Sequence, residues 1–121
     1  MQWMTEVGMH EMALAESVRG IVENAVRDRP GCKVKTVVLE IGTLASVEVD
    51  ALRFCLEVVL RDSVADGANV EVENVPGQGW CIECAANVSI SSLFDACPDC
   101  GGYQVRPTSG TEMRVKELEV E

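Results

Sequence analysis

Four cysteines in two closely spaced pairs give the strongest indication of a chemical function in this sequence. They are Cys81, Cys84, Cys97 and Cys100, with two residues inside each pair and twelve between the pairs. A two-residue spacing lets the backbone turn so that both sulfurs face one point, and two such turns supply the four ligands of a tetrahedral zinc site. Because the segment offers no fifth ligand, we predict a closed, structural zinc ion.

Two other uses of these cysteines compete with zinc. The run from Trp80 through Cys81 to Cys84 resembles the Trp-Cys-x-x-Cys motif of thioredoxin-type redox proteins, but that motif begins a helix after a central strand, whereas Pro-Gly-Gln-Gly precedes it here. Two structural disulfides would suit an exported protein, yet the chain opens without the basic and apolar stretches of a signal peptide. The remaining cysteines, Cys32 and Cys55, are expected to be buried free thiols.

The only histidine of the chain, His10, is followed directly by Glu11. Imidazole nitrogen, carboxylate oxygen and backbone nitrogen together suit Ni²⁺ or Cu²⁺ in a tetragonal site. On spacing alone the commoner interpretation is a pair that begins a helix without metal, where the carboxylate of Glu11 interacts favourably with the helix dipole.

The composition limits the class of protein. The 121 residues fit one domain, or a small domain with a smaller module, and 47% hydrophobic residues are enough for a core. A formal net charge of −10 argues against binding duplex nucleic acid, where basic side chains must neutralise phosphates. The sequence has no apolar run long enough to cross a membrane. We therefore expect a cytoplasmic protein with reduced thiols.

The apolar pattern predicts two helices and three strands outside the cysteine segment. The predicted helices cover residues 12–26 and about 50–64, and Glu48 is expected to be a solvated carboxylate where the second one starts. The predicted strands are 33–41, 69–75 and 112–121. We expect an α+β fold, in which two helices pack on a three-stranded mixed sheet and the last strand rejoins the first two.

The segment from Gly77 to Pro107 is rich in Gly and Pro and has too few apolar residues to fold unaided. We interpret it as an inserted zinc-ribbon module with four cysteine ligands. The expected domains are an α/β domain formed by residues 1–76 and 108–121, and a zinc-binding domain formed by residues 77–107.

Several motifs in this order resemble the HypA/HybF family, the nickel metallochaperones of nickel–iron hydrogenase maturation. The run Met9-His10-Glu11 resembles the Met-His-Glu opening of the family, and Cys97-Pro-Asp-Cys100-Gly resembles its second cysteine pair. The resemblance runs from Met9 to the C-terminus. Its further matches are Gly42, Leu44, Val47, Ala51, Leu52, Phe54, Glu57, Gly110, Glu112, Leu118 and Glu119.

The resemblance implies that His10 is the principal ligand of a transferable Ni²⁺, with Met9 and Glu11 as neighbours of the nickel site. In the family the N-terminal amine and nearby backbone amides also bind nickel. Eight residues precede Met9 in this sequence, and an internal peptide nitrogen is a poorer ligand than a free amine, whose pKa is about 7.7–8.0. Either Met9 is the true translational start, or the extension is removed, or nickel binds through a weaker, altered ligand set. We expect Met9 to be the start, because residues 1–8 show no pattern that fits the rest of the chain.

The resemblance further implies nickel insertion into hydrogenase without bond-making chemistry. We expect a monomer or a homodimer. Its implied partners are a HypB-type GTPase, the precursor of the nickel–iron hydrogenase large subunit and, in some organisms, urease maturation proteins. The alternative is a zinc-ribbon interaction module of a transcription or translation assembly. Such a module should have a basic face, yet Arg106 is the only basic residue of 77–107, so we expect no nucleic-acid partner. An enzyme is a third class, but no nucleophile–base pair is recognisable.

Overall fold

The computed structural model describes the backbone of residues 7–121 and the side chains from His10 onward. The chain divides into two compact units. The first unit contains the chain up to Leu39, followed by Val47–Val72 and Arg114–Glu121. The second unit contains Glu40–Ser46 and Glu73–Met113.

Helix α1 extends over Val7–Ala25 and therefore begins earlier than the predicted start at residue 12. Met9, Glu11 and Met12 favour a helix, and the weaker helix formers Gly8 and His10 do not prevent it from starting at Val7. Ile21 lies away from the buried face, because it is 50% exposed although it is apolar. The side chains that α1 buries are Glu11, Ala15, Val18 and Val22, at helical spacing.

Helix α2 covers Val49–Val59 and is shorter than predicted. Glu48 is its N-cap residue, with an exposed side chain that accepts from the N–H of Asp50 (3.4 Å). At the other end, the hydroxyl of Ser63 donates to the carbonyl of Leu60 (2.7 Å). Asp62 adopts a left-handed backbone conformation (φ 63°), which breaks the helical path before Val64 and explains why the helix stops early.

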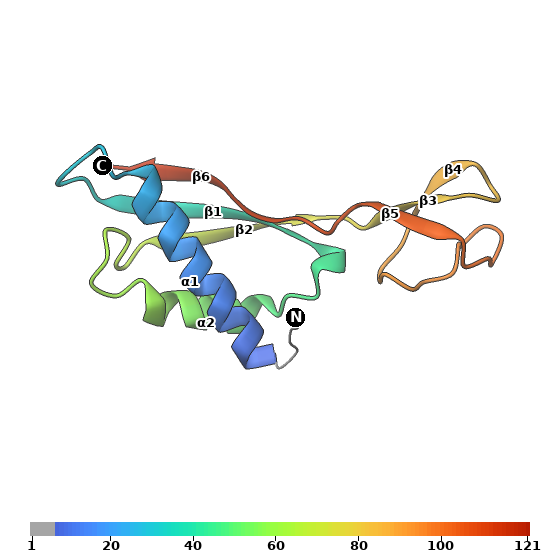
Figure 1. The fold of residues 1–121 in the computed structure, drawn as a ribbon, viewed down its shortest axis with the longest axis horizontal. Coiled ribbons are helices and arrows are strands. Elements are labelled where there is room, and N and C mark those ends of the chain that lie inside the picture. Colours follow the sequence, from blue (N-terminus) through green and yellow to red (C-terminus); the bar gives the residue numbers. More distant parts are fainter. Residues whose placement is uncertain (1–6) are drawn as a thin grey trace. The chain divides into compact units, whose positions relative to one another are not determined.

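The first sheet has the expected three strands, in the order β2-β1-β6. They are β1 (Val34–Gly42), β2 (Asn69–Val75) and β6 (Met113–Val120), and β2 has the predicted bounds. In Figure 1, β2 runs in the direction of β1 and β6 runs against it, so the sheet is mixed as predicted. The central strand β1 is the most buried, with Val37 and Leu39 completely enclosed. Both helices lie on one side of this sheet (Figure 1).

The second sheet is antiparallel, in the order β4-β3-β5. Its strands are β3 (Gln78–Cys81), β4 (Ala86–Ser89) and β5 (Val105–Ser109). The buried core of this unit contains Leu44, Cys81, Val88, Ile90 and Cys97, and Val105 packs against it. Two helices, a mixed sheet and this second antiparallel sheet around the cysteines together form the predicted α+β fold with a zinc-ribbon module.

Residues directly after β1 belong to the second unit. Leu44 lies in the short 3₁₀ helix Thr43–Ala45, and its N–H donates to the carbonyl of Gly110 (2.7 Å). A side chain on Gly42 would overlap the backbone of Gly110, so glycine is required for these two segments to approach each other. The zinc-ribbon core therefore includes residues from far outside the cysteine segment.

Candidate metal centre

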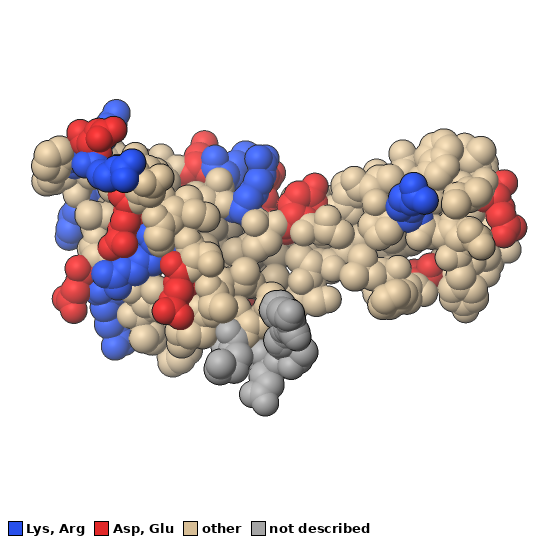
Figure 2. All heavy atoms as spheres, in the orientation of Figure 1, with Lys and Arg blue, Asp and Glu red and all other residues tan. Residues whose placement is uncertain are grey.

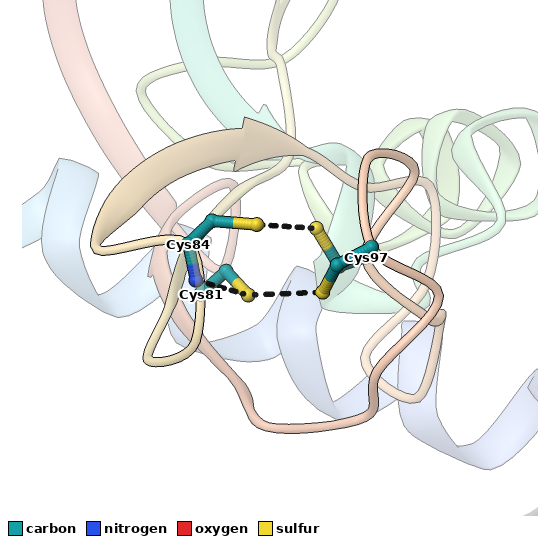
Figure 3. Close-up of side chains that lie close together, drawn as sticks. Cys81, Cys84 and Cys97 are labelled. Carbon is teal, nitrogen blue, oxygen red and sulfur yellow. Dashed lines mark hydrogen bonds between the residues drawn. The ribbon is translucent and has the colours of Figure 1, made fainter.

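The four predicted zinc ligands converge from two turns of the second unit. Cys81 ends β3 and Cys84 lies in the turn before β4, whereas Cys97 and Cys100 lie in the connection between β4 and β5. All four sulfurs lie within 4.8 Å of one another. Figure 3 shows the sulfurs of Cys81 and Cys84 directed toward the turn that carries Cys97. Within residues 7–121 every cysteine is a free thiol, so the structure contains no disulfide there.

The distances between the sulfurs match a tetrahedral zinc site. The sulfurs of Cys81 and Cys100 are 3.7 Å apart, and those of Cys84 and Cys97 are 3.9 Å apart. A tetrahedron with zinc–sulfur bonds of about 2.3 Å has edges of about 3.8 Å. Four cysteine sulfurs are one of the donor sets of structural zinc sites. These two distances, and the confinement of all four sulfurs within 4.8 Å of one another, suit a site for one Zn²⁺.

Backbone N–H groups hold the sulfurs in place at both turns. The N–H of Cys84 donates to the sulfur of Cys81 and the N–H of Asp99 donates to the sulfur of Cys97, each at 3.4 Å. The second turn is closed by the N–H of Gly101, which donates to the carbonyl of Cys97 (2.8 Å). Such donors stabilise a negatively charged sulfur. Both turns are thus suited to thiolates.

The thiols of the cluster differ in acidity when no metal neutralises them. Hydrogen bonds from the backbone N–H groups of Cys100 and Asp99 lower the pKa of Cys97 to about 7. A hydrogen bond with the side chain of Cys100, followed by those with Cys81 and Cys97, raises the pKa of Cys84 to about 12. Zinc binding must therefore displace protons from the cluster, so the apparent zinc affinity increases with pH.

The predicted nickel residues lie at the start of α1, in the first unit. His10 is partly exposed, whereas Glu11 is only 1% exposed. One carboxylate oxygen of Glu11, Oε2, accepts the backbone N–H of Glu48 (2.9 Å). Among the described side chains, the only group of three or more potential metal ligands is the cysteine cluster. The side chain of Met9 and residues 1–6 lie outside the described part of the chain.

The sequence pattern did not lead us to predict that Glu11 is buried, because a glutamate is expected at the surface. A signal was nevertheless present, since Glu11, Ala15, Val18 and Val22 follow the spacing of one helix face. Extending the apolar face of α1 by one turn would have placed Glu11 on it.

Charge is distributed without a large basic surface on the face shown in Figure 2. Lys and Arg side chains alternate there with Asp and Glu side chains over the helical unit. This arrangement differs from the basic stripe that binds phosphate backbones.

Comparison with known proteins places these features in a family. A family model described as "Hydrogenase/urease nickel incorporation, metallochaperone, hypA" matches residues 9–120. A hydrogenase maturation factor HypA from Azoarcus sp. (strain BH72) is 68% identical over 110 residues, which cover 91% of this chain and 96% of the relative. HypA from Dechloromonas aromatica (strain RCB) is 55% identical over 113 residues, covering 93% of this chain and all of that relative.

The fold is also similar to solved structures. The solution structure of the Ni metallochaperone HypA from Helicobacter pylori has a TM-score of 0.65 at 22% identity, covering 90% of this chain and 95% of that one. A second solution structure of a HypA protein has a TM-score of 0.67 at 24% identity, covering 92% and 95%. The matched sequence motifs, the cysteine cluster and the family model lead to one assignment. The chain belongs to the HypA family of metallochaperones for nickel incorporation into hydrogenase and urease.

Proposed function

We propose that this protein binds Ni²⁺ through His10 and delivers it during maturation of the nickel–iron hydrogenase large subunit. The observation that supports this most is the position of His10, which is the only imidazole of the chain and is partly exposed near the start of α1. A cargo ion must be released, which favours an accessible site over a closed cage. Met9 and Glu11 are the proposed neighbours of the nickel.

The cysteine cluster has a different proposed role. Cys81, Cys84, Cys97 and Cys100 would hold one structural Zn²⁺ whose binding stabilises the second unit. Cys81 and Cys97 are buried in the core of that unit, which favours permanent retention of the ion. In this division of roles, residues 77–107 form the zinc-binding domain, to whose core Leu44 also contributes. Residues 1–76 with 108–121 form the nickel-binding domain.

The proposed partners and place of action are inferred from membership of the HypA family. The proposed partners are a HypB-type GTPase, the hydrogenase large-subunit precursor and, where urease is present, its maturation proteins. The protein would act in the cytoplasm without catalysing a reaction of its own. Among the described residues, no helix is long and apolar enough to cross a membrane.

Nickel titration by calorimetry tests the proposal directly. The zinc-loaded protein should bind one Ni²⁺, and His10→Ala should remove this binding while the zinc content stays at one ion per chain. Glu16→Ala is the control, because Glu16 is an exposed carboxylate on the same helix and should be dispensable. Undiminished nickel binding by His10→Ala would contradict the proposal.

A further inference from the structure

Glu11 links the two helices of the first unit at the end where His10 lies. Its Oε2 atom accepts the backbone N–H of Glu48, the N-cap residue of α2, at 2.9 Å. Glu11 is 1% exposed, so water has little access to its side of this hydrogen bond. A single side chain in the early turns of α1 therefore fixes the N-cap residue of α2.

This contact replaces an interaction that helices usually make within themselves. In a capping box, a glutamate or glutamine at the third helical position reaches back to the N–H of the N-cap residue. In α2 the third position is Ala51, which has no acceptor in its side chain. Glu11 takes over the role from a different helix, so capping of α2 and placement of α1 depend on the same atom.

Packing alone does not account for a carboxylate at this position. The other oxygen of Glu11, Oε1, is buried without a hydrogen-bond partner among the described residues. A buried polar atom without a partner destabilises a fold. The buried side chain of Glu11 is therefore kept at a cost in stability, and its position next to His10 points to a role in the site.

We propose that Glu11 is a positioning residue for the nickel site, which holds the His10-bearing turn of α1 against the N-terminal end of α2. This inference rests on the proposed binding of nickel by His10. The side chain acts through its hydrogen bond to Glu48 and is not itself a nickel ligand.

A second contact between the same helices provides a matched control. The guanidinium of Arg19 donates to the carbonyl of Val59 (2.7 Å), so it also ties α1 to α2. This contact lies more than two helical turns from His10 along α1. Arg19→Ala removes a helix–helix hydrogen bond at a distance from the site, whereas Glu11→Ala removes one beside it.

Nickel titration of the zinc-loaded variants tests the role of Glu11. We expect Glu11→Ala to weaken nickel binding about tenfold, the effect of one lost hydrogen bond, and Glu11→Gln and Arg19→Ala to stay close to the parent. In the double variant Glu11→Ala/Ala51→Glu, the new glutamate can cap α2 from within. Thermal stability should then recover. Nickel binding should remain weak, because the hydrogen bond that joins α1 to the N-cap of α2 is still missing.

Hydrogen exchange on the parent protein adds a measurement that needs no variant. If the two positions are coupled, nickel loading should slow exchange of the Glu48 amide proton. Unchanged exchange on loading would overturn the inference. It would also be overturned by parent-like nickel binding in Glu11→Ala, by equal weakening in Arg19→Ala, or by Glu11→Gln binding as weakly as Glu11→Ala.

The His10→Ala variant distinguishes the proposed nickel binding by His10 from the proposed positioning role of Glu11. Loss of nickel in His10→Ala with parent-like binding in Glu11→Ala would refute the positioning role and leave the proposed function intact. Retention of nickel in His10→Ala would refute the proposed function itself.

Discussion

Ala85 and Gly101 occupy equivalent places, each directly after the second cysteine of its pair, and both have a positive backbone φ (52° and 76°). This left-handed conformation suits glycine, whereas for other residues it costs about 1–2 kcal/mol. The first turn of the cluster thus contains local strain that the second turn avoids.

Reciprocal substitutions should therefore have opposite effects. Ala85→Gly should stabilise the zinc-loaded protein by about 0.5–1 kcal/mol, and Gly101→Ala should destabilise it by about 1–2 kcal/mol. No atom lies within 4 Å of a Cβ added at Gly101, so the loss would arise from the backbone alone. Denaturant unfolding of both variants measures the two changes, and a shift in the same direction would contradict the explanation.

Removal of one cluster thiol should unfold the second unit without unfolding the first. In Cys97→Ser the zinc content should fall well below one ion per chain, because a hydroxyl is a poor zinc ligand. Structural zinc contributes on the order of 10–16 kcal/mol in small zinc peptides, so its loss exceeds the stability of most domains. Metal analysis and amide exchange measure the effect. Cys32→Ser is the control, since Cys32 lies outside the cluster and should leave the zinc content unchanged.

Leu44 is expected to stabilise the zinc-ribbon core although it lies more than 30 residues before the first cysteine pair. It is 3% exposed and packs in the core that contains Cys81 and Cys97. Leu44→Ala should cost about 2–5 kcal/mol. Leu93→Ala is the control within the same unit, because Leu93 is 40% exposed and should cost far less. Equal losses in denaturant unfolding would show that Leu44 is not part of the core.

The first residue of the chain should control nickel affinity. A protein that begins at Met9 presents a free amine next to His10, and an amine of pKa about 7.7–8.0 is a better nickel ligand than a peptide nitrogen. Calorimetric titration should give tighter nickel binding by the chain from Met9 than by the chain from Met1. Equal affinities would mean that the amine does not participate.

The sequence alone determined the elements whose signals are local. The spacing of four cysteines predicted the cluster, because each pair needs only one turn to converge. Alternating side chains predicted β2 with correct bounds, and the order of elements predicted the sheet that β6 rejoins. Helix ends were less well predicted, since the early start of α1 and the turn at Ser63 depend on weak local preferences.

Only the tertiary structure decided which distant residues meet. Glu11 is buried because the end of α2 supplies a donor from 37 residues away, and Leu44 joins the zinc-ribbon core because Gly42 and Gly110 allow close approach. The helical spacing of α1 places Glu11 on the buried face, but nothing in the neighbouring residues identifies the distant partner of either contact. Their free energy comes from excluding water between separate segments, which local sequence does not encode.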